Sequence, residues 1–189
     1  IAGLSPQVIT ETLYALHQDG VGIDEIHVIA TRVGRDAIAT QLLAPDDGRY
    51  FRYLKEYGID PKSILFSQDT IHVLRDDKSR PLDDITGEEE NEILLKSCLT
   101  LAHRFTKSVK NTVFFSIAGG RKTMSACLMV AAQTYARPQD RIYHVLVSPE
   151  FESHRDFYYP HVKPVLLELR DARGQTIFKD TSYAKVTLV

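Results

Sequence analysis

The sequence predicts an α/β domain with a mainly parallel sheet and helices on both of its faces. Short apolar segments alternate with amphipathic helical segments along most of the chain, as expected when helices connect parallel strands. Segments 26–30 and 113–117 are almost continuously apolar, which is typical of strands buried on both faces. The chain has 189 residues, 43% of them hydrophobic and 25% charged, so residues 1–189 suit one globular domain. The predicted architecture is Rossmann-like.

The first residues predict the end of a strand and the start of a helix. Ile1-Ala2-Gly3 suits the carboxyl end of a first strand whose beginning precedes Ile1. Ser5 suits the N-cap and Pro6 the first position of the helix that follows. Apolar residues recur at helical spacing as far as Gly20, which ends this helix.

The remaining elements have similar local signals. Thr86 to Glu89 has the form of a capping box, which predicts that a helix begins there. The turn Ala172 to Gly174 between apolar segments 165–169 and 175–178 indicates a C-terminal β-hairpin. Further helices are expected at 36–43, 50–57 and 121–135, and further strands at 26–30, 64–66, 71–74, 113–117 and 142–147.

Composition argues against several kinds of partner. The net charge is −2, so a long nucleic acid is not expected, because non-specific binding favours a basic chain. No apolar run reaches the roughly 18 residues that a membrane span needs, and no signal peptide is visible. Cys98 and Cys127 lie in apolar helical contexts, which predicts buried free thiols in a cytoplasmic protein. No zinc motif is present, and we expect no metal and no cofactor.

The loop Gly3 to Gln7 is the first candidate for ligand binding. It follows the first predicted strand, and ligands of parallel sheets bind at the carboxyl ends of strands. Gly3 allows close approach of the backbone, while Ser5 offers a hydroxyl and Gln7 an amide. The free N–H groups of the helix start favour an anion.

The loop Ser116 to Ser125 is the second candidate, and its signal is stronger. Gly119-Gly120 allows a tight turn at the end of the strand. Arg121 and Lys122 stand in the first turn of the next helix, where their positive charge opposes the helix dipole. A bound phosphate would reverse that penalty, because both cations, the Thr123 hydroxyl and free backbone N–H groups would converge on it.

Known nucleotide motifs do not fit the second loop. A Walker A loop needs a glycine directly before its lysine, and Arg121 precedes Lys122 here. The dinucleotide fingerprint G-x-G-x-x-G is absent, and the strand at 26–30 leads into Thr31-Arg32 rather than an acidic residue. A dehydrogenase is therefore disfavoured.

Together, the two loops resemble motifs of the CRISPR-associated Rossmann-fold (CARF) domain family. Gly3 to Tyr14 is similar to the first motif, Ser116 to Ser125 to the second, and Phe157 to Pro160 is also similar to the family, so the resemblance spans nearly the whole chain. It implies a freestanding type III CRISPR accessory protein that binds cyclic tetra- or hexa-adenylate. CARF domains are generally homodimers, and a two-fold symmetric ring suits an isologous dimer.

The resemblance implies that both loops hold the ligand. Ser5 and Gln7 would contact ribose or phosphate, and the start of the second helix would hold phosphates. Thr31, Arg32 and Ser67 end neighbouring predicted strands and are expected to line the adenine pockets, although the motifs do not fix this. The predicted ligand-binding set is Gly3, Leu4, Ser5, Pro6, Gln7, Thr10, Thr31, Arg32, Ser67, Ala118, Gly119, Gly120, Arg121, Lys122, Thr123 and Met124.

Two other features are interpreted as non-catalytic. Arg155 and His161 have a spacing that resembles the motif of HEPN ribonucleases, but Tyr158-Tyr159-Pro160 would break the helix on which that motif sits. The segment 150–160 is instead expected to cover the site or to contact a second subunit. The aspartates of the 76–84 loop are expected to be solvated; they are Asp76, Asp77, Asp83 and Asp84.

No effector domain is recognisable in the sequence, which favours a ring nuclease, an enzyme that cuts the cyclic messenger. A ribose 2′-OH beside each phosphate is a built-in nucleophile, so Lys122, Arg121 and Ser5 are expected to act on it without a metal. Two alternatives remain open. One is a non-catalytic cyclic oligoadenylate sensor that regulates an effector nuclease, and the other is a nicotinamide or mononucleotide enzyme.

Overall fold

A computed structural model describes residues 1–152, 154–171 and 173–189, and it confirms the α/β class. Within these ranges the helices are α1 (Gln7–Gln18), α2 (Arg32–Gln41), α3 (Arg49–Glu56), α4 (Glu88–Thr106) and α5 (Lys122–Tyr135), with 3₁₀ turns η1 (Gln68–Thr70) and η2 (Thr181–Tyr183). The strands are β1 (Val28–Ala30), β2 (Ile71–Val73), β3 (Phe114–Ser116), β4 (Arg141–Tyr143), β5 (Val145–Val147), β6 (Leu166–Arg170), β7 (Thr176–Asp180) and β8 (Val186–Leu188).

Two parallel strand pairs frame the N-terminal segment. β1 pairs with β2 and β3 pairs with β4, both in parallel. Ala2 forms a parallel bridge with Ala30, and the Ile1 amino group donates to the Ser116 carbonyl at 3.4 Å. The first residues of the chain therefore lie between β1 and β3, in the extended conformation expected for a strand end.

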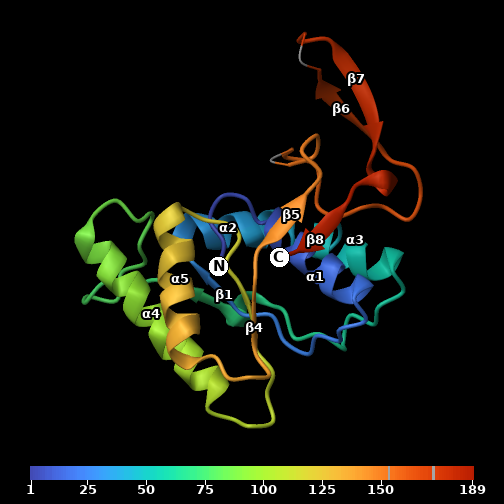
Figure 1. The fold of residues 1–189 in the computed structure, drawn as a ribbon. Helices are drawn as coiled ribbons and strands as arrows, with labels where there is room; N and C mark the ends of the chain where they lie inside the picture. The colour runs from blue at the N-terminus through green and yellow to red at the C-terminus, as the bar shows by residue number, and fades with distance from the viewer. Residues whose placement is uncertain (153, 172) are drawn as a thin grey trace.

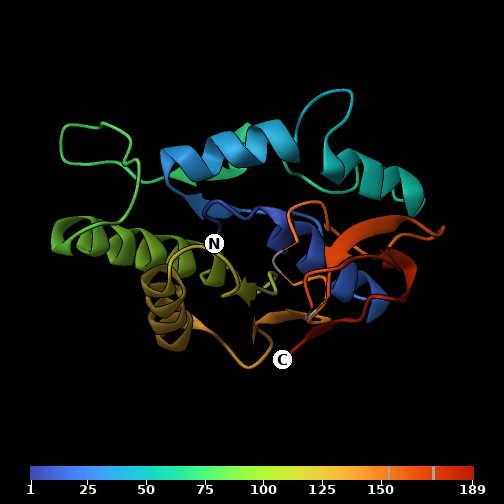
Figure 2. The ribbon, with the colours of Figure 1, turned by 90° about the horizontal axis from the view of Figure 1, so that it is seen from above.

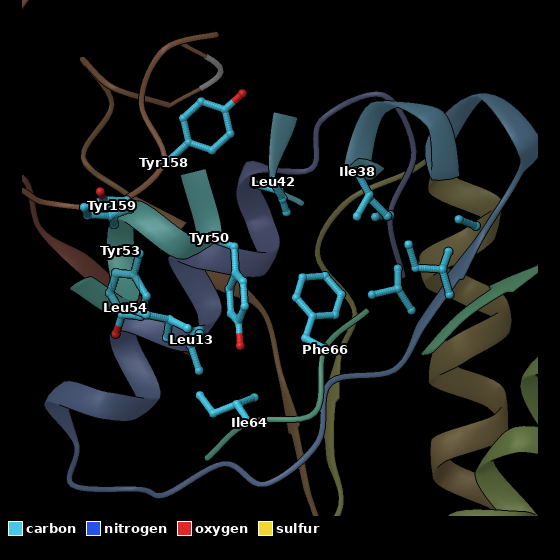
Figure 3. Close-up of a cluster of buried hydrophobic side chains, with 14 residues drawn as sticks. Leu13, Ile38, Leu42, Tyr50, Tyr53, Leu54, Ile64, Phe66, Tyr158 and Tyr159 are labelled. Carbon is cyan, nitrogen blue, oxygen red and sulfur yellow. The ribbon is translucent and has the colours of Figure 1, made fainter. Parts of the chain in front are cut away.

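The strand β1 contributes to two hydrophobic clusters, because successive side chains of a strand point to opposite faces. Val28 and Ala30 join the cluster formed with α1, α2 and α3, which Figure 3 shows in close-up. Ile29 joins the cluster formed with α4 and α5, which lie side by side in Figures 1 and 2. Helices thus cover both sides of β1, as the sequence predicts.

The C-terminal part differs from the expectation of one strand at 142–147. The chain changes partner at His144: β4 runs parallel to β3, whereas β5 runs antiparallel to β8. His144 and Val189 exchange two backbone hydrogen bonds of 2.9 and 3.0 Å, which extend the β5–β8 pairing. The strand β8 was not predicted from the sequence. The expected hairpin forms between β6 and β7 and projects from the body in Figure 1, while Ala172 of its turn lies outside the described residues.

Several predicted boundaries are also wrong. Ser5 does not cap α1, because Pro6 occupies the N-cap position and no side-chain hydrogen bond caps this helix. α2 begins at Arg32 rather than residue 36, since Thr31 caps it by accepting from the Gly34 N–H at 3.2 Å. α4 begins after Gly87 instead of Thr86, and the Gly87 N–H donates to the Glu90 carboxylate at 2.7 Å.

Candidate functional site

The starts of three helices lie at one edge of the parallel strands. α1 follows the N-terminal segment, α2 follows β1, and α5 follows β3. Ala2 forms a parallel bridge with Ala30 at the end of β1, and a Cβ on Gly3 would lie 2.9 Å from the Cα of Gly120 ahead of α5, so the three helix N-termini lie close together. Helix N-termini carry free N–H groups and a positive partial charge, so this edge favours a polyanion.

The two predicted loops touch at their glycines. A Cβ atom on Gly3 would lie 2.9 Å from the Cα of Gly120, so the backbones approach more closely than any side chain allows. Gly119 and Gly120 have φ values of 91° and 73°, a left-handed conformation that favours glycine. A Cβ on Gly34, in the first turn of α2, would also lie 3.0 Å from the Ala2 carbonyl oxygen. Glycines therefore allow all three helix starts to meet.

The start of α5 offers one paired and one unpaired cation. Arg121 binds Asp84 through two hydrogen bonds, one of them 2.8 Å from Nε to Oδ1, and these bonds lower the pKa of Asp84 to about 2. Lys122 is exposed and forms no ion pair with any described residue. Thr123 is exposed as well, and no side chain caps this helix. The first turn of α5 thus keeps an ammonium, a hydroxyl and backbone N–H groups available.

Arg32 at the start of α2 has the same kind of partner. Its Nε donates to Asp83 at 2.5 Å and its Nη1 to Asp36 at 3.3 Å, and the hydrogen bond to Asp83 raises the pKa of the guanidinium. Asp83 and Asp84, the partner of Arg121, are solvated as predicted, with side chains 66% and 46% exposed, but each also pairs with an arginine. The prediction is wrong for Asp76, whose side chain is 12% exposed and pairs with Arg80 on the same loop.

Some predicted ligand residues lie inside the protein. Thr10 is fully buried, and its hydroxyl donates to the Gln7 carbonyl at 3.0 Å. Met124 is 1% exposed and packs beneath Gly120, and Ala118 is buried beside them. These residues support the loops and do not reach the surface. Leu4, by contrast, is 73% exposed, and Ser5 next to it is exposed too.

The expectation that Ser67 ends a strand is wrong. Leu65 forms a bridge with Glu25, but the chain then makes the η1 turn and resumes pairing as β2. The Ser67 hydroxyl accepts from the Asp69 N–H at 3.2 Å and so caps that turn. The next strand, β2, ends at Val73, so Ser67 precedes a strand instead of ending one.

The described residues of segment 148–160 pack against the start of α1. Gln7 donates its side-chain N–H to the Arg155 carbonyl at 3.3 Å, while its Oε1 is buried without a hydrogen-bond partner among the described residues. Glu11, one turn further along α1, is 8% exposed, and burial, reinforced by Glu152, raises its pKa to about 7. The 150–160 segment therefore covers part of the first loop's helix, while His161 pairs with Glu56 at 2.8 Å.

One cavity lies beside the site, and Ser116 is the only residue of the two loops among its lining residues. It has a volume of about 600 Å³ and lies between α1, β1, β3 and α4, with Ile1, Thr12, His27, Phe105 and Tyr143 among its lining residues. No residue of the predicted ligand set lines it. The candidate site is thus an exposed basic edge made of loops and helix starts.

Sequence reasoning missed Gly34, Asp83 and Asp84. Gly34 has a sequence signal, because a glycine inside a predicted helix often marks a close backbone approach. Asp83 and Asp84 have only a weak sequence signal, which is the pattern of two acids between the apolar residues Leu82 and Ile85. Their partners lie 51 and 37 residues away, so the pairing requires the fold.

Comparison with known families identifies the family of this chain. The family model for CRISPR-associated protein NE0113 matches residues 5–189, which include the second loop and the first loop from Ser5 onward. The chain belongs to the NE0113 family of CRISPR-associated proteins. A search of curated proteins finds no match.

The described part of this NE0113-family chain shows neither a membrane-spanning helix nor a metal-binding cluster. Over the described residues, no helix is both long and apolar enough to cross a membrane. The described part of the chain also holds no group of three or more His, Cys, Asp or Glu side chains arranged to bind a metal ion.

Proposed function

We propose that this NE0113-family protein is a CARF domain that binds a cyclic oligoadenylate. The proposal joins the two parallel strand pairs through the N-terminal segment into one Rossmann-like sheet, with the order β2, β1, residues 1–3, β3 and β4. The observation that carries it is the contact between Gly3 and Gly120, which brings both predicted motifs and the start of α2 to one edge. A ring of phosphates matches an edge with several helix N-termini and only local positive charge.

The proposal includes a homodimer with the ring on its two-fold axis. A single edge presents Lys122 and Thr123 on an exposed surface rather than within an enclosed pocket. A second copy facing it would double these groups and enclose the ring, and an isologous contact matches the symmetry of the ligand. The ligand is synthesised inside the cell, so the proposal places the protein in the cytoplasm. Its free buried Cys98 and Cys127 suit that compartment.

We further propose that the protein cleaves the ring. A ribose 2′-OH would lose its proton to water, and its oxygen would attack the adjacent phosphorus. The bond to the 5′-oxygen would break, and linear products with a 2′,3′-cyclic phosphate and a 5′-hydroxyl would result. Lys122 would stabilise the charge that develops on the phosphoryl oxygens and protonate the leaving 5′-oxygen. The exposed Ser5 would orient the ring, and Arg121 would bind a phosphate once it leaves Asp84.

The alternative is a sensor that binds the ring without cutting it. One observation favours it: Arg121 is held by Asp84, and among the described residues no histidine or carboxylate contacts Lys122 or Ser5 to act as a base. Such a protein would pass the signal to an effector nuclease.

The test is incubation of the purified protein with cyclic tetra-adenylate and cyclic hexa-adenylate in excess chelator, followed by chromatography of the products. We expect linear adenylates, and we expect Lys122→Ala to abolish them. Lys96→Ala, a substitution on α4, is the matched control and should cleave at the wild-type rate. Tight binding of an intact ring without cleavage would support the sensor alternative. Binding of neither ring would refute the proposed function.

A further inference from the structure

The segment from Leu82 to Ile85 is held firmly against the candidate site. The Leu82 N–H donates to the Leu74 carbonyl at 2.9 Å, and the Leu82 carbonyl accepts from the Arg32 N–H at 2.7 Å. Ile85 is 5% exposed and packs in the core cluster of α4 and α5. The two aspartates between these anchors therefore have defined positions, although their own side chains reach the surface.

Each aspartate neutralises one arginine at a helix start. Asp83 binds Arg32 at the start of α2, and Asp84 binds Arg121 at the start of α5. A guanidinium beside a helix N-terminus is otherwise repelled by the helix dipole. The carboxylate oxygens thus make the kind of contact with the arginines that phosphate oxygens make in a complex.

We propose that Asp83 and Asp84 are affinity-setting residues of the anion site, which a ligand's phosphates displace from Arg32 and Arg121. The inference rests on the proposed function, because it assigns a phosphate-bearing ligand to the same edge. Each exchange replaces one charge-assisted pair by another, so a small phosphate gains little from it. A ring that reaches both arginines and also contacts Lys122 gains those additional contacts, and the site is thereby directed to polyphosphate ligands.

The geometry distinguishes this role from a purely structural one. The four side chains are between 42% and 66% exposed, and ion pairs of that exposure stabilise a fold only slightly. If the role were structural, each aspartate variant would have a lower melting temperature than the wild type and unchanged affinity for anions. An affinity-setting role leaves the melting temperature nearly unchanged and tightens anion binding.

The test compares Asp84→Asn and Asp83→Asn with Asp77→Asn, measuring Kd by calorimetry for two probes, pyrophosphate and cyclic tetra-adenylate. Asp77 is the matched control, because it is exposed on the same loop and forms no ion pair among the described residues. We expect Asp84→Asn to bind each probe about two- to five-fold tighter than Asp77→Asn does. In the Arg121→Gln background, Asp84→Asn should no longer increase the affinity, because the increase comes from releasing Arg121 from Asp84.

Three results would overturn the inference: equal affinities in Asp84→Asn and Asp77→Asn, weaker binding in Asp84→Asn, or no binding of pyrophosphate to any variant. Tighter pyrophosphate binding by Asp84→Asn with no binding of the ring would support the inference and refute the proposed ligand. Circular-dichroism melting of all variants gives the second readout, and a fall of more than about 4 °C in Asp84→Asn alone would indicate a structural role instead.

Discussion

Replacing Gly3 by alanine should force the two loops apart. The new Cβ would lie 2.9 Å from the Cα of Gly120, whereas carbon atoms in contact prefer about 3.5–4.0 Å. The backbones must therefore separate by about 0.6–1.1 Å. Overpacking of this kind costs about 1–3 kcal/mol, against which the alanine recovers about 0.4–1 kcal/mol by restricting the unfolded chain.

Gly22→Ala is the matched control for this change. Neither Gly3 nor Gly22 has a positive φ, and a Cβ at Gly22 meets nothing within 4 Å. Thermal unfolding should place Gly3→Ala below Gly22→Ala by about 2–12 °C, since 1 kcal/mol corresponds to about 2–4 °C in a domain of this size. Binding of cyclic tetra-adenylate should weaken in Gly3→Ala alone. If Gly3→Ala melts at or above Gly22→Ala, the close contact between the loops does not exist.

Three further predictions concern buried groups. Burial raises the pKa of Glu11 from 4.5 to about 7. The protonated carboxyl therefore contributes its full stability below pH 4.5, and this contribution is lost as the pH rises through about 7. Glu11→Gln should therefore melt above the wild type at pH 8 and close to it at pH 4.5, and equal melting at both would contradict the burial. Asp140, with no side-chain exposure, accepts from the Val113 and Arg137 N–H groups at 2.8 Å each, so Asp140→Ala should cost about 3–5 kcal/mol in urea unfolding. Asp77→Ala is its control, and a loss below about 1 kcal/mol would refute the role of Asp140. Burial also raises the pKa of the Cys98 thiol to about 12, so a disulfide reagent at pH 8 should label it only after unfolding; rapid labelling of the native protein would refute this.

Local signals predicted the elements that depend on nearby residues. The apolar strand around Phe115, the turn at Gly119-Gly120 and the helix that follows all agree with the structure. The hairpin of β6 and β7 was also predictable, because two apolar segments flank a short polar turn.

Features that depend on distant residues were not predictable. The Ser5 cap failed because Pro6 takes the cap position with helical dihedral angles, which the residue types alone do not reveal. β8 was missed because its partner β5 lies about 40 residues earlier and continues directly from β4. The pairing of Asp84 with Arg121 likewise arises only when the 76–85 loop folds across the sheet edge.

Hydrogen bonds of Arg155 and His154 connect the start of α1 with the projecting hairpin. Gln7 holds the Arg155 carbonyl, and the adjacent His154 places its Nε2 atom 3.1 Å from the Glu168 carbonyl on β6. Two hydrogen bonds thus separate the start of α1 from the projecting hairpin. The candidate site and the hairpin of β6 and β7 are therefore joined by side-chain contacts as well as by the course of the chain.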